Sequence, residues 1–194
     1  NQAYLNKEEA SVLIETMEKQ VFDLIQKRRG IQDFTPIMDV TLNALKTIEE
    51  ASKTQGVVTG IPTGFTDLDM KLTGMHGSQL ILVAARPAMG KTAFVLNIAE
   101  HVVFKKNIPT AIFSLEMGKE DLVMRLMAMH SLVDSQKIRT GNLNDSEWDK
   151  VMESTNIIGN SKLVIDDTGG IGIGELRSKC RKYKQNFDLG LIII

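Results

Sequence analysis

The nine residues AARPAMGKT, at positions 84–92, lie between two apolar runs, LILV and AFVLNIAE. Met89 is their one large aliphatic side chain, and they end in Gly-Lys-Thr. A loop of this composition between a strand and a helix is typical of a phosphate-binding site. The stretch therefore predicts a strand, a loop and a helix in that order, which is a building unit of α/β folds.

From Phe65 onward, short apolar runs alternate with amphipathic stretches. The runs predict strands at 79–85, 109–115, 162–166 and 190–194. The stretches between them predict helices at about 90–104, 118–131, 145–156 and 174–185. Continuous apolar runs fit strands that are buried on both faces, so the pattern predicts a parallel sheet with right-handed crossovers and flanking helices.

The amino-terminal part predicts two helices. Apolar residues recur at three- and four-residue steps over 8–28, and again over 35–51, where Thr35 and Pro36 form a typical helix start. A polar, glycine-containing connector follows. Two interpretations remain open for these helices: a hairpin folded onto the domain, or a linker that docks on a neighbouring subunit and so implies an oligomer.

The net charge of −1 gives no global reason to expect nucleic-acid or membrane binding. The basic stretch RSKCRKYKQ, at 177–185, is interpreted as a solvated helix face. Cys180 is the sole cysteine, which excludes an internal disulfide, and no apolar run approaches 18 residues. We therefore expect a soluble, cytoplasmic protein.

The loop matches the pattern G-x-x-x-x-G-K-[ST] except at its first position. Its eight residues are the candidate nucleotide-binding set: Ala85, Arg86, Pro87, Ala88, Met89, Gly90, Lys91 and Thr92. Gly90 allows the backbone to curl around an anion, Lys91 supplies a charge for the β- and γ-phosphates, and the Thr92 hydroxyl would bind magnesium. Ala85 is acceptable if its position needs no positive φ.

Glu116 follows the predicted strand 109–115, at the edge where α/β sheets bind ligands. Two interpretations fit it: the carboxylate that activates water for hydrolysis, or a polar residue that simply precedes the next helix. Asp166 and Asp167 are interpreted as loop and cap residues rather than magnesium ligands. The glycines of DDTGGIGIGE do not match G-x-G-x-x-G and predict a loop.

Taken together, several stretches resemble the DnaB family of bacterial replicative DNA helicases. They are TGIPTGFTDLD, AARPAMGKT, IFSLEM, RTGNL and VIDDTGG. The resemblance covers the whole chain, and the family's loop also lacks the first glycine. It implies a RecA-like ATPase domain that starts at 59 and is truncated at 194. It also implies a linker helix within 31–58 and the end of an amino-terminal helical region within 1–30.

The resemblance further implies a homohexameric ring that hydrolyses ATP with Mg²⁺ and moves 5′ to 3′ on single-stranded or forked DNA. Primase and a helicase loader are the implied partners. Lys91, Thr92 and Glu116 match the family's P-loop lysine, magnesium-binding threonine and catalytic glutamate. The chain stops at Ile194 inside an apolar strand. We therefore expect a fragment with little or no hydrolysis of its own.

Two other functions stay open. One is another RecA-like DNA-dependent ATPase, such as a recombinase, which would share the loop and the glutamate but gives no reason for the linker helices. The other is a non-hydrolysing assembly or loader-binding piece, in which the nucleotide only stabilises subunit contacts.

Overall fold

The computed structural model describes residues 17, 20–21, 35–53 and 58–194. The chain divides into two units, 1–55 and 56–194, and each is considered by itself. The helix predicted over 8–28 lies almost wholly outside the described residues. No helix in the described part is both long and apolar enough to cross a membrane.

The first unit contains helix α2 (Ile37–Lys53), so the helix predicted over 35–51 is confirmed with a shift of two residues. The Val40 N–H donates to the Pro36 carbonyl, which makes Pro36 the residue that caps the helix. None of the residues of α2 is buried. Its apolar side chains are among the most exposed of the described chain, with Ile37 at 78% and Ile48 at 66%.

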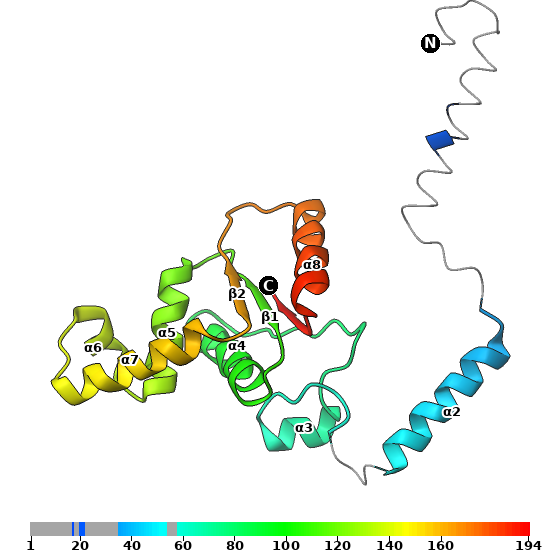
Figure 1. Cartoon of the computed structure of the whole chain (residues 1–194), viewed down its shortest axis with the longest axis horizontal. Coiled ribbons are helices and arrows are strands. Elements are labelled where there is room, and N and C mark those ends of the chain that lie inside the picture. Colours follow the sequence, from blue (N-terminus) through cyan, green and yellow to red (C-terminus); the bar gives the residue numbers. More distant parts are fainter. Residues whose placement is uncertain (1–16, 18–19, 22–34, 54–57) are drawn as a thin grey trace, which may run out of the picture. The chain divides into compact units, whose positions relative to one another are not determined.

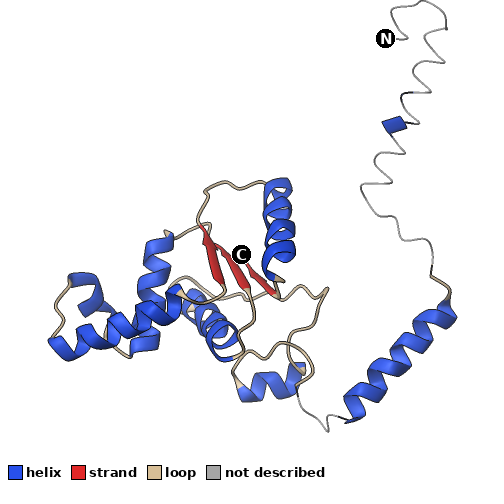
Figure 2. Ribbon diagram, viewed as in Figure 1, coloured by secondary structure: helices blue, strands red, loops and turns tan. Residues whose placement is uncertain are grey.

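The second unit is built on a parallel three-stranded sheet in the order β2-β1-β3. The strands are β1 (Thr110–Phe113), β2 (Leu163–Asp166) and β3 (Leu191–Ile193). Each lies within a predicted strand, so three of the four predicted strands are confirmed. Figure 2 shows the sheet with helices on both sides.

The helices of this unit follow the predicted alternation, with two additions. Those expected are α4 (Lys91–Glu100) with its π-helical extension η2 (His101–Lys105), α5 (Lys119–Ser131), α7 (Asp145–Gly159) and α8 (Ile173–Phe187). Those not predicted are the short helices α3 (Thr66–Leu72) and α6 (Ser135–Thr140). Figure 1 shows their places in the unit.

The alternating side chains of β1 divide the core between the two faces of the sheet. Ile112 packs against Leu96 and Ala99 of α4 and against α5, whereas Ala111 and Phe113 pack against α8. This alternation is the period of two that a strand dictates. The second unit is therefore a three-layer α/β/α arrangement, with α4 and α5 on one face and α8 on the other.

The strand predicted at 79–85 is wrong, because these residues form no sheet ladder. Leu80 and Leu82 are 85% and 83% exposed. An apolar run becomes a strand only where its N–H and C=O groups find a neighbouring strand. In the described part of the chain, the three-stranded sheet ends at β2 and β3, and 79–85 pairs with neither.

Candidate functional site

The loop before α4 has a backbone conformation suited to curling around an anion. Gly90 has φ 84° and Ala88 has φ 62°, so two positions of the loop lie in the left-handed region. The Met89 N–H donates to the Arg86 carbonyl at 3.2 Å, which closes a turn between them. Left-handed residues interspersed with right-handed ones turn successive N–H groups toward one concave side.

Ala85, where the pattern has its first glycine, is not among the residues with positive φ. The expectation that an alanine is acceptable at this position is therefore confirmed. Alanine does occupy a left-handed position three residues later, at Ala88, where a side chain adds strain of about 1 kcal/mol.

Helix α4 begins directly at Lys91, and Gly90 caps it without a side chain. The first N–H groups of the helix therefore donate to no capping side chain, and the positive end of the helix dipole points at the loop. Lys91 is exposed and Thr92 half-buried. A helix amino terminus with uncapped N–H groups and a positive dipole end is a favourable position for binding an anion.

Glu116 lies in the loop between β1 and α5, at the carboxyl end of the central strand, and its side chain is exposed. Helix α4 packs on the same strand through Leu96 and Ala99. Within the described residues, no hydrogen bond or ion pair joins Glu116 to Lys91. The two candidate catalytic groups thus belong to neighbouring elements without touching.

Asp166, the last residue of β2, and Asp167, which follows it, take part in hydrogen bonds that no motif predicted. The Asp166 carboxylate accepts the Thr168 N–H at 3.0 Å and pairs with Lys179 of α8 at 2.7 Å. The bond from Lys179, followed by those from Thr168, lowers the pKa of Asp166 to about 2. The Asp167 carboxylate accepts the N–H of Lys119, the first residue of α5, at 3.2 Å. Asp167 therefore acts as a cap, as interpreted from the sequence, whereas Asp166 is the last residue of β2 rather than a loop residue, and its carboxylate bonds to the turn that follows.

The basic stretch on α8 is a solvated helix face, as expected. Leu176, Cys180 and Tyr183 pack toward the sheet. The other side of the helix exposes Arg177, Arg181, Lys182 and Lys184. Burial raises the pKa of the Cys180 thiol, so this cysteine is a packing residue rather than a nucleophile.

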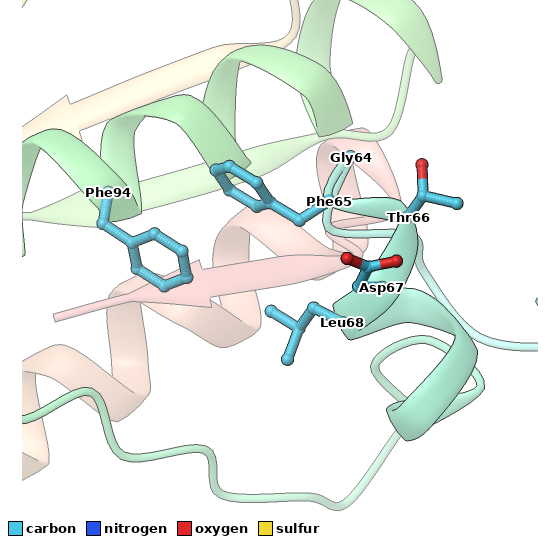
Figure 3. A pocket seen from close by; sticks show the side chains of 6 residues that line it. All are labelled: Gly64, Phe65, Thr66, Asp67, Leu68 and Phe94. Carbon is cyan, nitrogen blue, oxygen red and sulfur yellow. The ribbon is translucent and has the colours of Figure 1, made fainter.

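An open depression of about 610 Å³ lies between α3 and α4, lined by Gly64, Phe65, Thr66, Asp67, Leu68 and Phe94. Figure 3 shows the Phe65 and Phe94 rings side by side on its apolar side. None of the eight residues of the 85–92 loop lines it. Residues 85–91 of the loop are exposed.

Two solved structures resemble the fold. One is described as an ATPase domain, and it matches with a TM-score of 0.76 and 32% identity, over 83% of this chain and 56% of that one. The other is described as "The Structure Of A DnaB-Like Replicative Helicase And Its Interactions With Primase". It matches with a TM-score of 0.71 and 30% identity, over 95% of this chain and 45% of that one. A parallel sheet between helices, similar to these two structures, defines an α/β protein of the RecA-like class.

The family described as DnaB-like helicase C terminal domain matches residues 60–194. The replicative DNA helicase DnaC of Bacillus subtilis is 44% identical over 191 residues. DnaB of Geobacillus stearothermophilus is 40% identical over the same length. This chain belongs to the DnaB-like helicase family. The aligned part is 98% of this chain and 42% of each of these two relatives.

Proposed function

We propose that this chain forms the linker helix and the ATP-binding part of a replicative DNA helicase. Such an enzyme would unwind duplex DNA 5′ to 3′ at the fork, in the cytoplasm. The observation that carries the proposal is the loop at 85–92. It combines left-handed positions at Ala88 and Gly90 with an exposed lysine at the start of α4, in a domain that matches the DnaB-like family.

The residues of the loop fit a magnesium-bound nucleoside triphosphate. The curled backbone of 85–90 and the free N–H groups of α4 would hold the phosphates, and the Lys91 ammonium would neutralise the β- and γ-phosphates. The Thr92 hydroxyl would be a ligand of Mg²⁺. The metal ion would supply charge neutralisation for phosphoryl transfer.

Glu116 would accept the proton of the attacking water. Its side chain is exposed and has no hydrogen-bond or ion-pair partner in the described part of the chain, so the carboxylate is free to accept a proton. A carboxylate in this role typically contributes a factor of about 10² to 10⁴ in rate.

The exposed apolar face of α2 supports the homohexamer. Its apolar side chains include Ile37, Leu45 and Ile48, each more than half exposed. A contiguous apolar face of this kind marks an interaction surface. We infer that α2 packs on the neighbouring subunit of a ring. Single-stranded or forked DNA, a primase and a loader are the proposed partners of the whole protein.

The test is strand displacement by the full-length protein on a forked duplex with a free 5′ tail. The variants are Glu116→Gln, Lys91→Ala and the control Glu153→Gln, which changes an exposed glutamate on α7. We expect ATP-dependent unwinding by the wild type and the control, and loss of unwinding in the two site variants. ATP-dependent DNA binding without displacement would favour a recombinase-like ATPase or an assembly role instead.

A further inference from the structure

The loop that carries Glu116, residues 114–118, is attached at both ends to the carboxyl end of β2, through Asp166, the last residue of the strand, and Asp167, which follows it. At its start, the Ser114 N–H donates to the Asp166 carbonyl at 2.8 Å. At its end, the Lys119 N–H donates to the Asp167 carboxylate at 3.2 Å. Two consecutive residues, about 50 positions further along the chain, therefore hold both ends of the loop.

Asp167 supplies a cap that α5 lacks locally. The residue before the helix is Gly118, which has no side chain to accept the first N–H groups. The Asp167 carboxylate, 48 residues further along the chain, accepts the Lys119 N–H in place of a local capping side chain. It also lies 3.4 Å from the Lys119 ammonium. A carboxylate at a helix amino terminus is favoured by the hydrogen bond and by the helix dipole. The bond from the Lys119 N–H accordingly lowers the pKa of Asp167.

The interior of the loop is closed by Ser114. Its hydroxyl donates to the Met117 carbonyl at 2.7 Å and accepts the Met117 N–H at 3.2 Å. Glu116 lies within this closed turn, and its own side chain has no bonded partner in the described residues. The position of its carboxylate therefore depends on where the backbone of the loop is held.

The segment that holds the loop is itself anchored. The Asp166 carboxylate accepts the Thr168 N–H at 3.0 Å, and Lys179 of α8 lies 2.7 Å from it. Lys179 also pairs with Glu175 one turn earlier, at 3.1 Å. These contacts attach the turn at 166–168 to α8. Asp167 therefore accepts the hydrogen bond from α5 on a stretch of backbone that is itself held in place.

We propose that Asp167 is a positioning residue for Glu116, acting through the cap of α5 and the backbone of the 114–118 loop. This inference rests on the proposed function, in which Glu116 activates water. Within the described residues, the hydrogen bond and ion pair of the Asp167 side chain go to Lys119 and none goes to the nucleotide-binding loop, so Asp167 should affect the rate of hydrolysis without affecting nucleotide affinity.

The experiment measures kcat and KM for ATP hydrolysis by the full-length protein, together with its thermal midpoint. Asp167→Ala removes the acceptor for the Lys119 N–H, and we expect kcat to fall by about tenfold or more with KM unchanged. Asp167→Asn keeps an oxygen acceptor and should recover most of kcat. The control Asp149→Ala changes an exposed aspartate on α7 and should leave both constants unchanged.

A double variant distinguishes the loss of Glu116 positioning from a general loss of structure. In a Glu116→Gln background, adding Asp167→Ala should cause no further loss of kcat, because the group it positions has already been disabled. Unchanged kcat in Asp167→Ala would overturn the inference. So would a rise in KM with a lowered thermal midpoint that Asp167→Asn fails to rescue. Wild-type hydrolysis by Glu116→Gln alone would instead refute the proposed function, so the two failures are distinguishable.

Discussion

Phe65 and Phe94 stack with their ring centroids 5.1 Å apart and their planes inclined by 23°. Phe65 immediately precedes α3, and Phe94 lies in the first turn of α4, three residues after Lys91. The contact therefore connects a helix that the sequence did not predict to the helix that begins at the candidate nucleotide loop.

Phe65→Ala should destabilise the second unit modestly. The Phe65 residue is 39% exposed, so the substitution removes part of a buried ring and one aromatic pair. We expect a loss of about 1–2 kcal/mol in the free energy of unfolding. Thermal unfolding of the full-length protein measures it. Phe187→Ala is the control, because Phe187 is exposed at the end of α8 and has no ring partner among the described residues.

The strands that the sequence predicted correctly share one property, which is that their neighbouring strands and covering helices also lie in the described chain. Helix α2 was also predicted correctly although none of its residues is buried, because a helix makes its backbone hydrogen bonds within itself. The runs around β1, β2 and β3 are buried against each other and against α4, α5 and α8. The run at 79–85 is equally apolar but forms no strand. A hydrophobic pattern indicates that a segment favours burial. A strand also requires a neighbouring strand that bonds to its backbone N–H and C=O groups.

The two helices that the sequence did not predict are short and have little apolar periodicity to detect. Their signals are at their starts. Asp134 accepts the N–H groups of Gln136 and Lys137 to cap α6, and Asp67 and Asp69 lie in the first turn of α3. Attention to helix starts would have found α6 through its Asp134 cap, whereas α3 has no side-chain cap and offers only acidic residues in its first turn.

The site was predictable only where its residues are local in sequence. The loop at 85–92 and Glu116 stand out as motifs, although their functional roles remain predictions. The contact between Asp167 and Lys119 joins residues 48 positions apart. No local pattern in a single sequence indicates such a pair.

Asp69→Asn should destabilise the protein at neutral pH. The Asp69 carboxylate is buried and accepts the Thr63 N–H and hydroxyl, both at 2.7 Å, and the Gly64 N–H at 3.1 Å. Asparagine offers one oxygen for these three donors. We expect a loss of about 2–3 kcal/mol in the free energy of unfolding. Asp67→Asn, which changes an exposed aspartate of the same helix, is the control.

The effect of Asp69→Asn should also depend on pH. Burial alone would raise the pKa of Asp69, but the hydrogen bonds from Thr63 and Gly64 and the charge of His101 lower it below the ordinary 3.8. A lowered pKa contributes stability that is complete above 3.8 and is lost as the pH falls through the folded-state value. The difference in thermal midpoint between wild type and variant should therefore shrink below about pH 4. A constant difference down to about pH 3 would contradict this assignment.

Gly190→Ala should strain the start of β3. A methyl group at this position would lie 2.5 Å from Cγ2 of Ile108. Ile108 is branched at Cβ and cannot easily rotate away, and the Gly190 N–H is bonded to the Pro109 carbonyl at 2.9 Å. We expect a loss of about 1–3 kcal/mol in unfolding free energy.

Two further variants check that interpretation. Ile108→Ala combined with Gly190→Ala should cost less than the sum of the single substitutions, because the smaller side chain leaves room for the methyl group. Gly159→Ala, at the end of α7, meets nothing within 4 Å and should be close to neutral. Additive costs in the double variant would mean that the contact with Ile108 is not the source of the strain.

Gly90→Ala should weaken nucleotide binding without disrupting the fold. A methyl group at this position meets no atom within 4 Å, but the backbone has φ 84°, which alanine adopts at a cost of about 1–2 kcal/mol. If the curled loop is required to hold phosphate, that cost appears in the binding free energy. The dissociation constant of a fluorescent ATP analogue should then rise by about 5- to 30-fold.

The matched control for that variant is Gly141→Ala. Gly141 caps α6 with φ 71° and also has open space around it, so alanine meets the same backbone strain away from the loop. We expect Gly141→Ala to lower the thermal midpoint and leave the dissociation constant unchanged. If both variants bound the analogue as tightly as the wild type, the left-handed conformation at Gly90 would have no part in phosphate binding, and Lys91 with the free N–H groups of α4 would have to provide it alone.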